Sequence, residues 1–181
     1  MSIGNTINLL DKWNKAYNLS AIRNIHEMLD RHLIDSLSIA KAIEGERFID
    51  VGTGPGLPGI PLAIFYPDKQ FSLLDSNGKK TRFLQQVKME LGLANIEVFN
   101  ERVEEHQTDK PYDGVLSRAF ASLQDMLDGA GHLCAENGHY YAMKGLYPEM
   151  ELQAISKPYK VQAITWSGNE VERHLVVISQ Q

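Results

Sequence analysis

The sequence has few of the features that mark secreted, metal-binding or membrane proteins. Its 181 residues include one cysteine, Cys134, so no internal disulfide can form and no cysteine cluster is available for a structural zinc ion. No window approaches the roughly 18 consecutive apolar residues that a membrane span needs. The N-terminus also lacks a basic start followed by an apolar stretch. We therefore expect a cytoplasmic protein with no metal site and no membrane partner.

The sequence also has fewer basic residues than acidic ones. The chain has 18 Lys and Arg against 23 Asp and Glu, which gives a formal net charge of -5. This balance argues mildly against non-specific nucleic-acid binding, although an acidic protein can still carry a local basic patch. The length suits one domain that buries its own core. We expect a single domain over 1–181, with a helical part over 1–45 and an α/β core over 46–181.

Hydrophobic periodicity changes at Gly45. Before it, apolar stripes with helical spacing predict helices over 3–17 and 25–43. After it, short apolar runs alternate with amphipathic stretches, the pattern of βαβ units in a parallel sheet. We predict strands at 47–51, 70–74, 96–99, 113–117, 138–143, 159–165 and 172–178, and helices near 58–65, 78–92, 122–133 and 148–155. The last two strands flank Ser167-Gly168-Asn169 and should form an antiparallel hairpin.

A glycine-rich turn follows the first predicted strand. Gly52, Gly54 and Gly56 lack Cβ atoms, so they can adopt positive φ and let a ligand lie against bare backbone, while the next helix start offers unpaired N–H groups. This pattern indicates a nucleoside site. Residues 54–59 also match GxGxxG literally, but Gly52 already follows the strand, so the register is wrong for a Rossmann dehydrogenase.

Acidic residues stand where the first strands end, which is where ligands bind in open α/β sheets. Asp50 either approaches the ammonium group of an amino-acid moiety or caps its own turn. Asp75, at the end of the second strand, can accept both hydroxyls of a ribose. After the third strand, Val103 can hold an adenine face and Glu104 can receive its exocyclic amine. Arg118 ends the fourth strand, either as a site residue or as a structural cation.

This arrangement resembles the class I methyltransferases that use S-adenosylmethionine. Further strings resemble the bacterial ribosomal RNA small subunit methyltransferase G family, also called glucose-inhibited division protein B; they are KWNKAYNLS, RHLIDSL, FIDVGTGPGLPGIPLAI, LLDSNGKKTRFL, RVEE, SRAFASL, AMKG and ERHLVVI. They run in order from about Lys12 to Ile178. Members usually carry an additional helical segment ahead of the first string, where about ten residues stand here. We expect that difference to concern RNA docking and not the cofactor site.

The resemblance implies an α/β, Rossmann-like fold with a seven-stranded, mostly parallel sheet. It also implies methyl transfer to N7 of guanine 527 in 16S ribosomal RNA, free or within the small ribosomal subunit. The matching motifs imply that the cofactor is bound by Gly52, Gly54, Leu57, Asp75, Val103, Glu104 and Arg118. We also expect Asp50 and Gly56, which belong to the same turn, to bind it. Guanine N7 needs no general base, so Arg118 should be a positioning residue beside the transferred methyl.

RNA contacts should come from local cations and one aromatic ring. The candidates are Lys79, Lys80, Arg82, Lys144, Arg173 and Phe120. Phe120 either stacks on a base or packs as a core ring. Two other functions remain open: a nucleotide-sensing or ribosome-assembly module without activity, and a methyltransferase that acts on a small molecule or protein. In each case we expect a monomer.

Overall fold

The computed structural model describes residues 29–118, 120–165 and 172–181. The helix expected over 3–17, the beginning of the helix expected over 25–43 and the turn at Ser167-Gly168-Asn169 lie outside these ranges. Among the described residues, no helix combines the length and the apolar character needed to cross a membrane.

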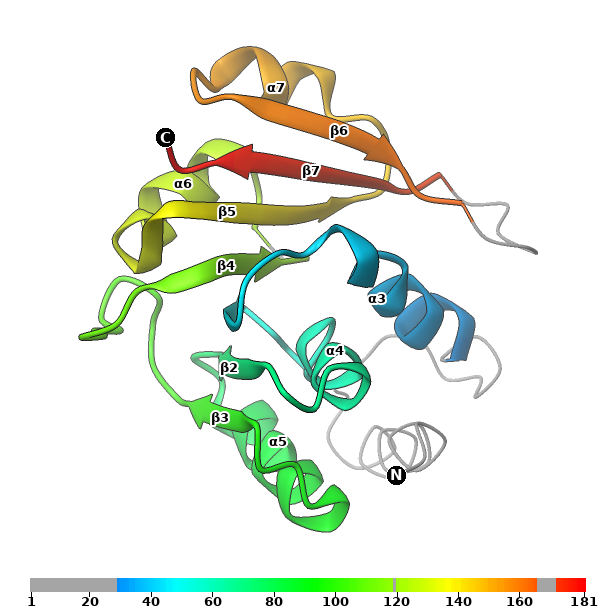
Figure 1. Cartoon of the computed structure of the whole chain (residues 1–181), viewed down its shortest axis with the longest axis vertical. Helices are drawn as coiled ribbons and strands as arrows, with labels where there is room; N and C mark the ends of the chain where they lie inside the picture. The colour runs from blue at the N-terminus through cyan, green and yellow to red at the C-terminus, as the bar shows by residue number, and fades with distance from the viewer. Residues whose placement is uncertain (1–28, 119, 166–171) are drawn as a thin grey trace.

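Seven strands form one sheet in the order β3-β2-β1-β4-β5-β7-β6 (Figure 1). They are β1 (Arg47–Val51), β2 (Gln70–Leu74), β3 (Ile96–Phe99), β4 (Tyr112–Ser117), β5 (Cys134–Lys144), β6 (Tyr159–Ala163) and β7 (His174–Ser179). The pairs among β1 to β5 are parallel, whereas β7 runs antiparallel between β5 and β6. The predicted fold class, with its antiparallel C-terminal strands, is confirmed. The strand order reverses between β1 and β4, and ligands of open α/β sheets bind at such a point.

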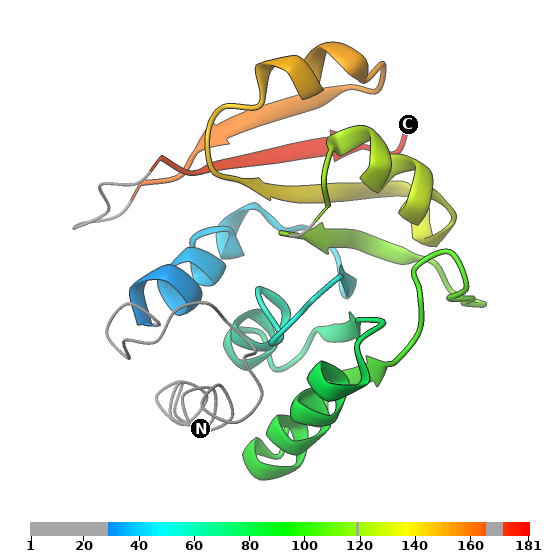
Figure 2. The same ribbon diagram turned by 180° about the vertical axis from the view of Figure 1, so that it is seen from behind.

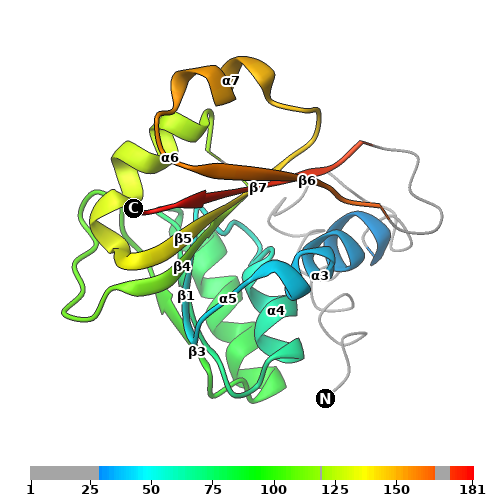
Figure 3. The ribbon, with the colours of Figure 1, turned by 45° about the horizontal axis from the view of Figure 1, so that its top comes forward.

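Helices cover both faces of the sheet. The two larger ones on the first face are α4 (Gly59–Phe65) and α5 (Gly78–Leu91), and the other face carries α6 (Leu123–Ala130) and α7 (Glu149–Ala154). Figures 2 and 3 show these two groups on opposite sides of the strands, with α3 (Asp35–Ser38) on the side of α4. Each face has its own apolar cluster, and the central side chains Phe48 and Ile49 of β1 are fully buried on opposite faces. This packing fixes the end of β1 at the centre of the molecule.

The segment before β1 is less regular than predicted. Instead of one helix continuing to residue 43, it consists of the π-helical η1 (Leu29–Ile34), α3 and the 3-10 helix η2 (Ala40–Ala42). The hydroxyl of Ser36 donates to the carbonyl oxygen of His32, and that of Ser38 donates to Asp35 at 2.5 Å. Serine hydroxyls that bond to the preceding turn compete with the helical hydrogen bonds, which accounts for the interruption.

Smaller differences concern element ends. The helix predicted over 122–133 ends as α6 at Ala130 and continues only as the 3-10 turn η3 (Gly131–Leu133). That turn leads directly into β5, which therefore starts at Cys134 rather than at 138. At the other end of the sheet, β6 stops at Ala163, two residues before the predicted end.

Helix α5 brings its first turn to the carboxyl edge of the sheet, because β2 ends just before it. The side chain of Asn77 caps the helix by accepting from the backbone N–H of Lys79 at 2.9 Å. At the other end, Gly92 takes the left-handed conformation with φ of 60°. The buried face of the helix, which includes Phe83 and Val87, packs on the sheet. Its exposed first turn therefore stays beside the end of β2.

Candidate functional site

The glycine turn between β1 and α4 has the conformation that its sequence predicts. Gly52, Gly54 and Gly56 have φ values of 66°, 60° and 89°. The backbone N–H groups of Gly56 and Leu57 both donate to the carbonyl oxygen of Thr53 at 3.0 Å, which closes the turn. Gly52 is exposed, so its backbone is open to a ligand.

Asp50 lies beneath this turn and is 1% exposed. Its Oδ2 accepts hydrogen bonds from the Thr53 hydroxyl at 2.6 Å and from the Gly59 backbone N–H at 2.8 Å. Its Oδ1 is buried without a hydrogen-bond partner in the described part of the chain. Asp50 therefore caps its own turn, one of the two roles that the sequence left open. A contact with a ligand ammonium group stays a prediction.

Burial raises the pKa of Asp50 from 3.8 to about 7, against the lowering effects of the Thr53 and Gly59 hydrogen bonds and the charge of Arg118. The native state therefore holds this proton more tightly than the unfolded state. The resulting stability is complete below pH 3.8 and is lost as pH rises to about 7. At most this amounts to about 4 kcal/mol.

Asp50→Asn should flatten this dependence, because an amide does not ionise in this range. Urea unfolding of both proteins between pH 4 and 8 measures it: the free energy of unfolding of the wild type should fall with pH relative to that of the variant. Parallel curves would show that Asp50 is ionised in the native protein throughout.

Asp75 joins the end of β2 to the glycine turn. Its Oδ2 accepts from the backbone N–H of Gly54 at 2.9 Å, and its Oδ1 accepts from that of Asn77 at 2.8 Å. The ammonium of Lys80 lies 3.5 Å from Oδ2. The side chain is 8% exposed, so a few atoms face solvent while two backbone donors and one cation hold it in place. Both oxygens keep lone pairs that a ligand hydroxyl can use.

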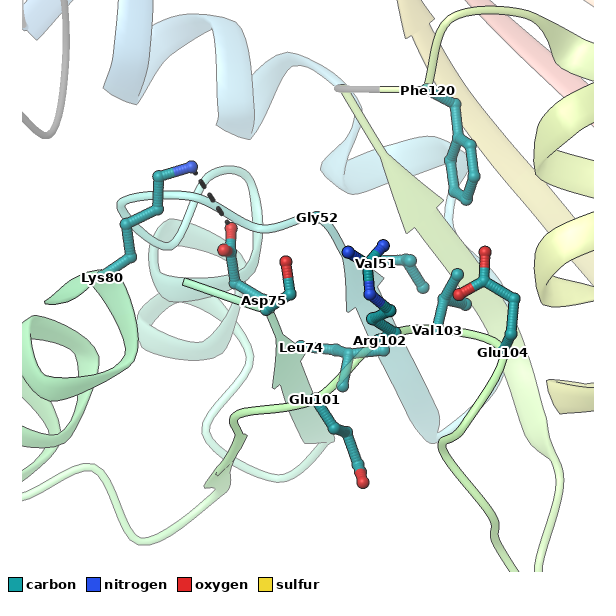
Figure 4. A pocket seen from close by; sticks show the side chains of 11 residues that line it. Val51, Gly52, Leu74, Asp75, Lys80, Glu101, Arg102, Val103, Glu104 and Phe120 are labelled. Atoms are coloured by element: carbon teal, nitrogen blue, oxygen red, sulfur yellow. Dashed lines mark hydrogen bonds and ion pairs between the residues drawn. The ribbon is translucent and has the colours of Figure 1, made fainter. Parts of the chain in front are cut away.

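A cavity of about 470 Å³ opens beside these residues. It is lined by Val51, Gly52, Leu74, Asp75, Ser76, Lys80, Glu101, Arg102, Val103, Glu104 and Phe120. Figure 4 shows Asp75 and Lys80 on one side, with Phe120, Val103 and Glu104 on the other. The volume lies within the roughly 300–1,000 Å³ of small-molecule sites. Acidic groups at the two ends and apolar side chains between them suit a nucleoside.

The structure brings together part of the predicted cofactor set. Gly52, Asp75, Val103 and Glu104 line the cavity. Gly54 lies next to it, through its bond to Asp75. Three more predicted residues stand under or within the turn and do not line the cavity; they are Asp50, Gly56 and Leu57.

Two residues predicted to contact RNA, Lys80 and Phe120, line the same cavity, and their contact with RNA stays a prediction. Phe120 lies near Val103, since a Cβ on Gly129 would be 3.6 Å from an atom of each. Sequence reasoning missed Arg102 and Glu101 as lining residues. The signal for them was their place within three residues of the end of β3, in the stretch that supplied Val103 and Glu104.

Arg118 lies outside this cavity and lines a small neighbouring recess with Phe120 and Lys144. Its Nη2 is 3.6 Å from Oδ2 of Asp35, and Nε of Arg173 is 3.3 Å from Oδ1 of the same carboxylate. Arg118 thus makes an ion pair and also lies at the carboxyl edge of the sheet, directly after β4.

The remaining predicted RNA cations differ in their surroundings. The ammonium of Lys144 lies 2.7 Å from Oε2 of Glu151, which also accepts from the backbone N–H of Leu123 at 2.8 Å. Lys79 and Arg82 are exposed within the first five residues of α5. These two are therefore the better placed of the three to meet a phosphate.

Comparison with known proteins places this chain in a family. The family model described as rRNA small subunit methyltransferase G matches residues 2–176. The Ribosomal RNA small subunit methyltransferase G of Idiomarina loihiensis is 54% identical over 178 residues, which cover 97% of this chain and 86% of that protein.

Solved structures share the fold at much lower identity. TYW2 of M. jannaschii in complex with AdoMet has a TM-score of 0.59 at 17% identity, over 80% of this chain and 74% of that one. TrmN from Thermus thermophilus has a TM-score of 0.64 at 19% identity, over 93% of this chain and 52% of that one. These likenesses bear on the fold alone. The family model and the 54% identical relative each span most of the sequence, and the chain therefore belongs to the rRNA small subunit methyltransferase G family.

Proposed function

We propose that this chain transfers a methyl group from S-adenosylmethionine to N7 of guanine 527 in 16S ribosomal RNA. The observation that carries the proposal is the cavity at the carboxyl edge of the sheet, with Asp75 fixed at one side, in a chain of this family.

The residues around the cavity fit the cofactor. Asp75 is held by two backbone donors and keeps free lone pairs for the two ribose hydroxyls. Val103 and Phe120 supply apolar contacts for adenine, and Glu104 supplies an acceptor for its amine. The exposed backbone of Gly52 forms a floor for the methionine part.

Methyl transfer to guanine N7 requires no acid or base catalysis by a side chain. S-adenosylmethionine supplies an electrophilic methyl group on a positively charged sulfur. Guanine N7 carries an in-plane lone pair and no proton at neutral pH, so no general base has to remove one. The protein contributes by holding the two reactants in line, an effect worth up to about 7–11 kcal/mol. Arg118 positions the substrate by donating to guanine O6 or to an RNA phosphate. It does not point at N7, which gains positive charge during transfer.

Lys79 and Arg82 should contribute to RNA affinity by neutralising phosphates. Replacing both with Ala should weaken RNA binding and reduce the dependence of log K on log salt by about 0.7 for each phosphate of a single-stranded RNA that is no longer neutralised. Cofactor affinity should not change, because neither residue lines the cavity.

Filter binding at several salt concentrations measures the effect. Lys110→Ala is the matched control, because it removes one exposed cation before β4, at the opposite edge of the sheet. An unchanged salt dependence in the double variant would place the RNA elsewhere.

We also propose that the protein acts in the cytoplasm, where ribosomal RNA is made and assembled. We further propose that it acts as a monomer. The proposal also includes one domain made of the helical part over 1–45 and the core over 46–181.

Labelled S-adenosylmethionine tests the activity. The protein is incubated with small ribosomal subunits, and separately with naked 16S RNA, from a strain that lacks the modification. One guanine should become labelled, and the better of the two substrates identifies the natural one. Tight cofactor binding without transfer to any RNA would favour the sensing or assembly module, and transfer only to a small molecule or protein would favour the third function.

A further inference from the structure

A buried histidine ends the loop that lines one side of the cavity. This loop runs from Glu101 to His106, and its first four residues, 101–104, all line the cavity. His106 is 3% exposed. Its Nδ1 lies 2.6 Å from Oε1 of Glu101, and its Nε2 lies 3.2 Å from the hydroxyl oxygen of Tyr112. A buried polar ring is costly unless it is hydrogen-bonded, and here both ring nitrogens have a partner.

The same histidine connects the loop to the core of the sheet. Its ring packs edge-on against that of Phe99, the last residue of β3, with 4.6 Å between the centroids. Tyr112, the first residue of β4, is 2% exposed, and its hydroxyl donates to Oγ of Ser72 in β2 at 3.1 Å. The backbone carbonyl oxygen of His106 also accepts from Nε2 of His132 in η3 at 3.0 Å. The end of the loop is therefore fixed to β3, β4 and η3.

The contact between Glu101 and His106 closes the loop. Inside it, the backbone N–H groups of Glu105 and His106 donate to the carbonyl oxygen of Arg102 at 3.1 and 3.2 Å, which makes a tight turn. In Figure 4 the side chain of Glu101 points away from that of Glu104. The Glu101 carboxylate thus ties the first residue of the loop to the last one, while Glu104 points in the other direction.

We propose that His106 is a positioning residue for the adenine end of the cofactor, because it holds the loop over 101–106 in the shape that lets Val103 and Glu104 meet the base. This rests on the proposed function, in which Glu104 accepts from the adenine amine. His106 does not line the cavity, so it acts through the loop. Hydrogen bonds weaken steeply below an angle of about 120°, so a small shift of the loop is enough to lose the contact of Glu104.

His106→Phe keeps an aromatic ring of similar size and removes both ring hydrogen bonds. The variant should fold, because the side chain of Glu101 is 35% exposed and can turn to water, and Tyr112 keeps its bond to Ser72. Its affinity for S-adenosylhomocysteine, the product that remains after methyl transfer, should fall by about 10-fold, the value of one charge-assisted hydrogen bond. Titration calorimetry without RNA measures this affinity.

An analogue of S-adenosylhomocysteine with purine in place of adenine separates positioning from a general loss of order, because it lacks only the exocyclic amine. Loss of the amine should weaken binding to the wild type by about 10-fold but binding to His106→Phe by about 2-fold at most, since Glu104 no longer meets it. A histidine that only stabilised the fold would leave the cost of removing the amine unchanged.

His139→Phe is the matched control. His139 lies in β5, two residues before Tyr141, and Tyr141 belongs to the apolar cluster on the other face of the sheet from Tyr112. The same substitution there should leave both the affinity for S-adenosylhomocysteine and the cost of removing the amine at their wild-type values.

Glu101→Ala removes the same contact from its other side, and it carries the test if His106→Phe does not fold. It should show the same loss of affinity and the same small cost of removing the amine. The double variant of Glu101→Ala and His106→Phe should lose no more than either single variant, because both remove one shared interaction.

Wild-type affinity in folded His106→Phe would overturn the proposal. An unchanged cost of removing the amine in the variants, or losses that add up in the double variant, would also overturn it. All of these results concern cofactor binding alone. A wild type that binds the cofactor and methylates no RNA would instead contradict the proposed function and leave the role of His106 standing.

Discussion

Asp75→Ala is expected to lower the affinity for S-adenosylmethionine by about 100-fold or more. Two hydrogen bonds from ribose hydroxyls to a carboxylate are worth about 3–6 kcal/mol together. The variant also loses the acceptors that hold the backbone N–H groups of Gly54 and Asn77. The glycine turn should therefore become less ordered, which adds to the loss. Titration calorimetry on the folded variant measures the affinity.

Asp113→Ala is the matched control for this experiment. Its carboxylate also accepts two backbone N–H groups, at 2.7 and 2.9 Å, but at the opposite edge of the sheet. It should cost stability while leaving cofactor affinity unchanged. Asp75→Asn, which keeps one acceptor oxygen, should fall between Asp75→Ala and the wild type. Equal affinities of Asp75→Ala and the wild type would remove Asp75 from the site, and an equal loss in Asp113→Ala would show that the effect is not local.

Gly56→Ala is expected to lower the free energy of unfolding by about 2–5 kcal/mol, the sum of a left-handed backbone cost and overpacking. Gly56 has φ of 89°, and an added Cβ would lie 2.3 Å from Cδ1 of Ile60 and 2.9 Å from Cδ2 of Leu84. Ile60 is in the first turn of α4, and its N–H donates to the carbonyl oxygen of Gly56 at 2.7 Å. Relief of the clash should therefore disturb both the turn and the start of the helix.

Alanine substitutions at two other glycines separate the energetic cost of the left-handed backbone from the cost of the steric clash. Gly54 has φ of 60°, but an added Cβ would meet nothing closer than 4.0 Å, so Gly54→Ala should cost only about 1–2 kcal/mol. Gly129 is helical, its nearest contacts would be 3.6 Å, and Gly129→Ala should stabilise by up to about 1 kcal/mol. Urea unfolding should rank Gly129→Ala above the wild type, followed by Gly54→Ala and then Gly56→Ala. A Gly56→Ala variant as stable as Gly54→Ala would contradict the packing around this turn.

Much of the fold could be predicted because the central strands leave clear marks in the sequence. Strands β1 and β2 begin and end where the apolar runs do, since they are buried between two helical layers, and the edge strand β3 keeps its predicted bounds although only Ile96 of it is buried. The segment before β1 could not be predicted as well. Its apolar spacing is helical throughout, and the interruption comes from serine hydroxyls that bond to the backbone.

The candidate site was predictable where the backbone alone places a residue. Gly52 and Asp75 directly follow β1 and β2, and Val103 lies four residues after the end of β3, so topology brings all three to one edge. The directions of long side chains were not predictable in this way. Lys80 turns toward Asp75 rather than outward, and Lys144 turns to Glu151. The contact of Asp35 with Arg118 depends on how α3 packs on the finished sheet, for which the sequence carries no local signal.

Methyl transfer to 16S RNA that carries 7-deazaguanine at position 527 tests the central claim most directly. This base has a C–H group in place of N7 and no lone pair there, while its pairing edge is unchanged. With labelled S-adenosylmethionine, the RNA with guanine should take up one methyl group and the RNA with 7-deazaguanine should take up none. Equal labelling of the two RNAs, or no labelling of the guanine RNA, either free or assembled into small ribosomal subunits, by protein that binds the cofactor, would contradict transfer to N7 at this position.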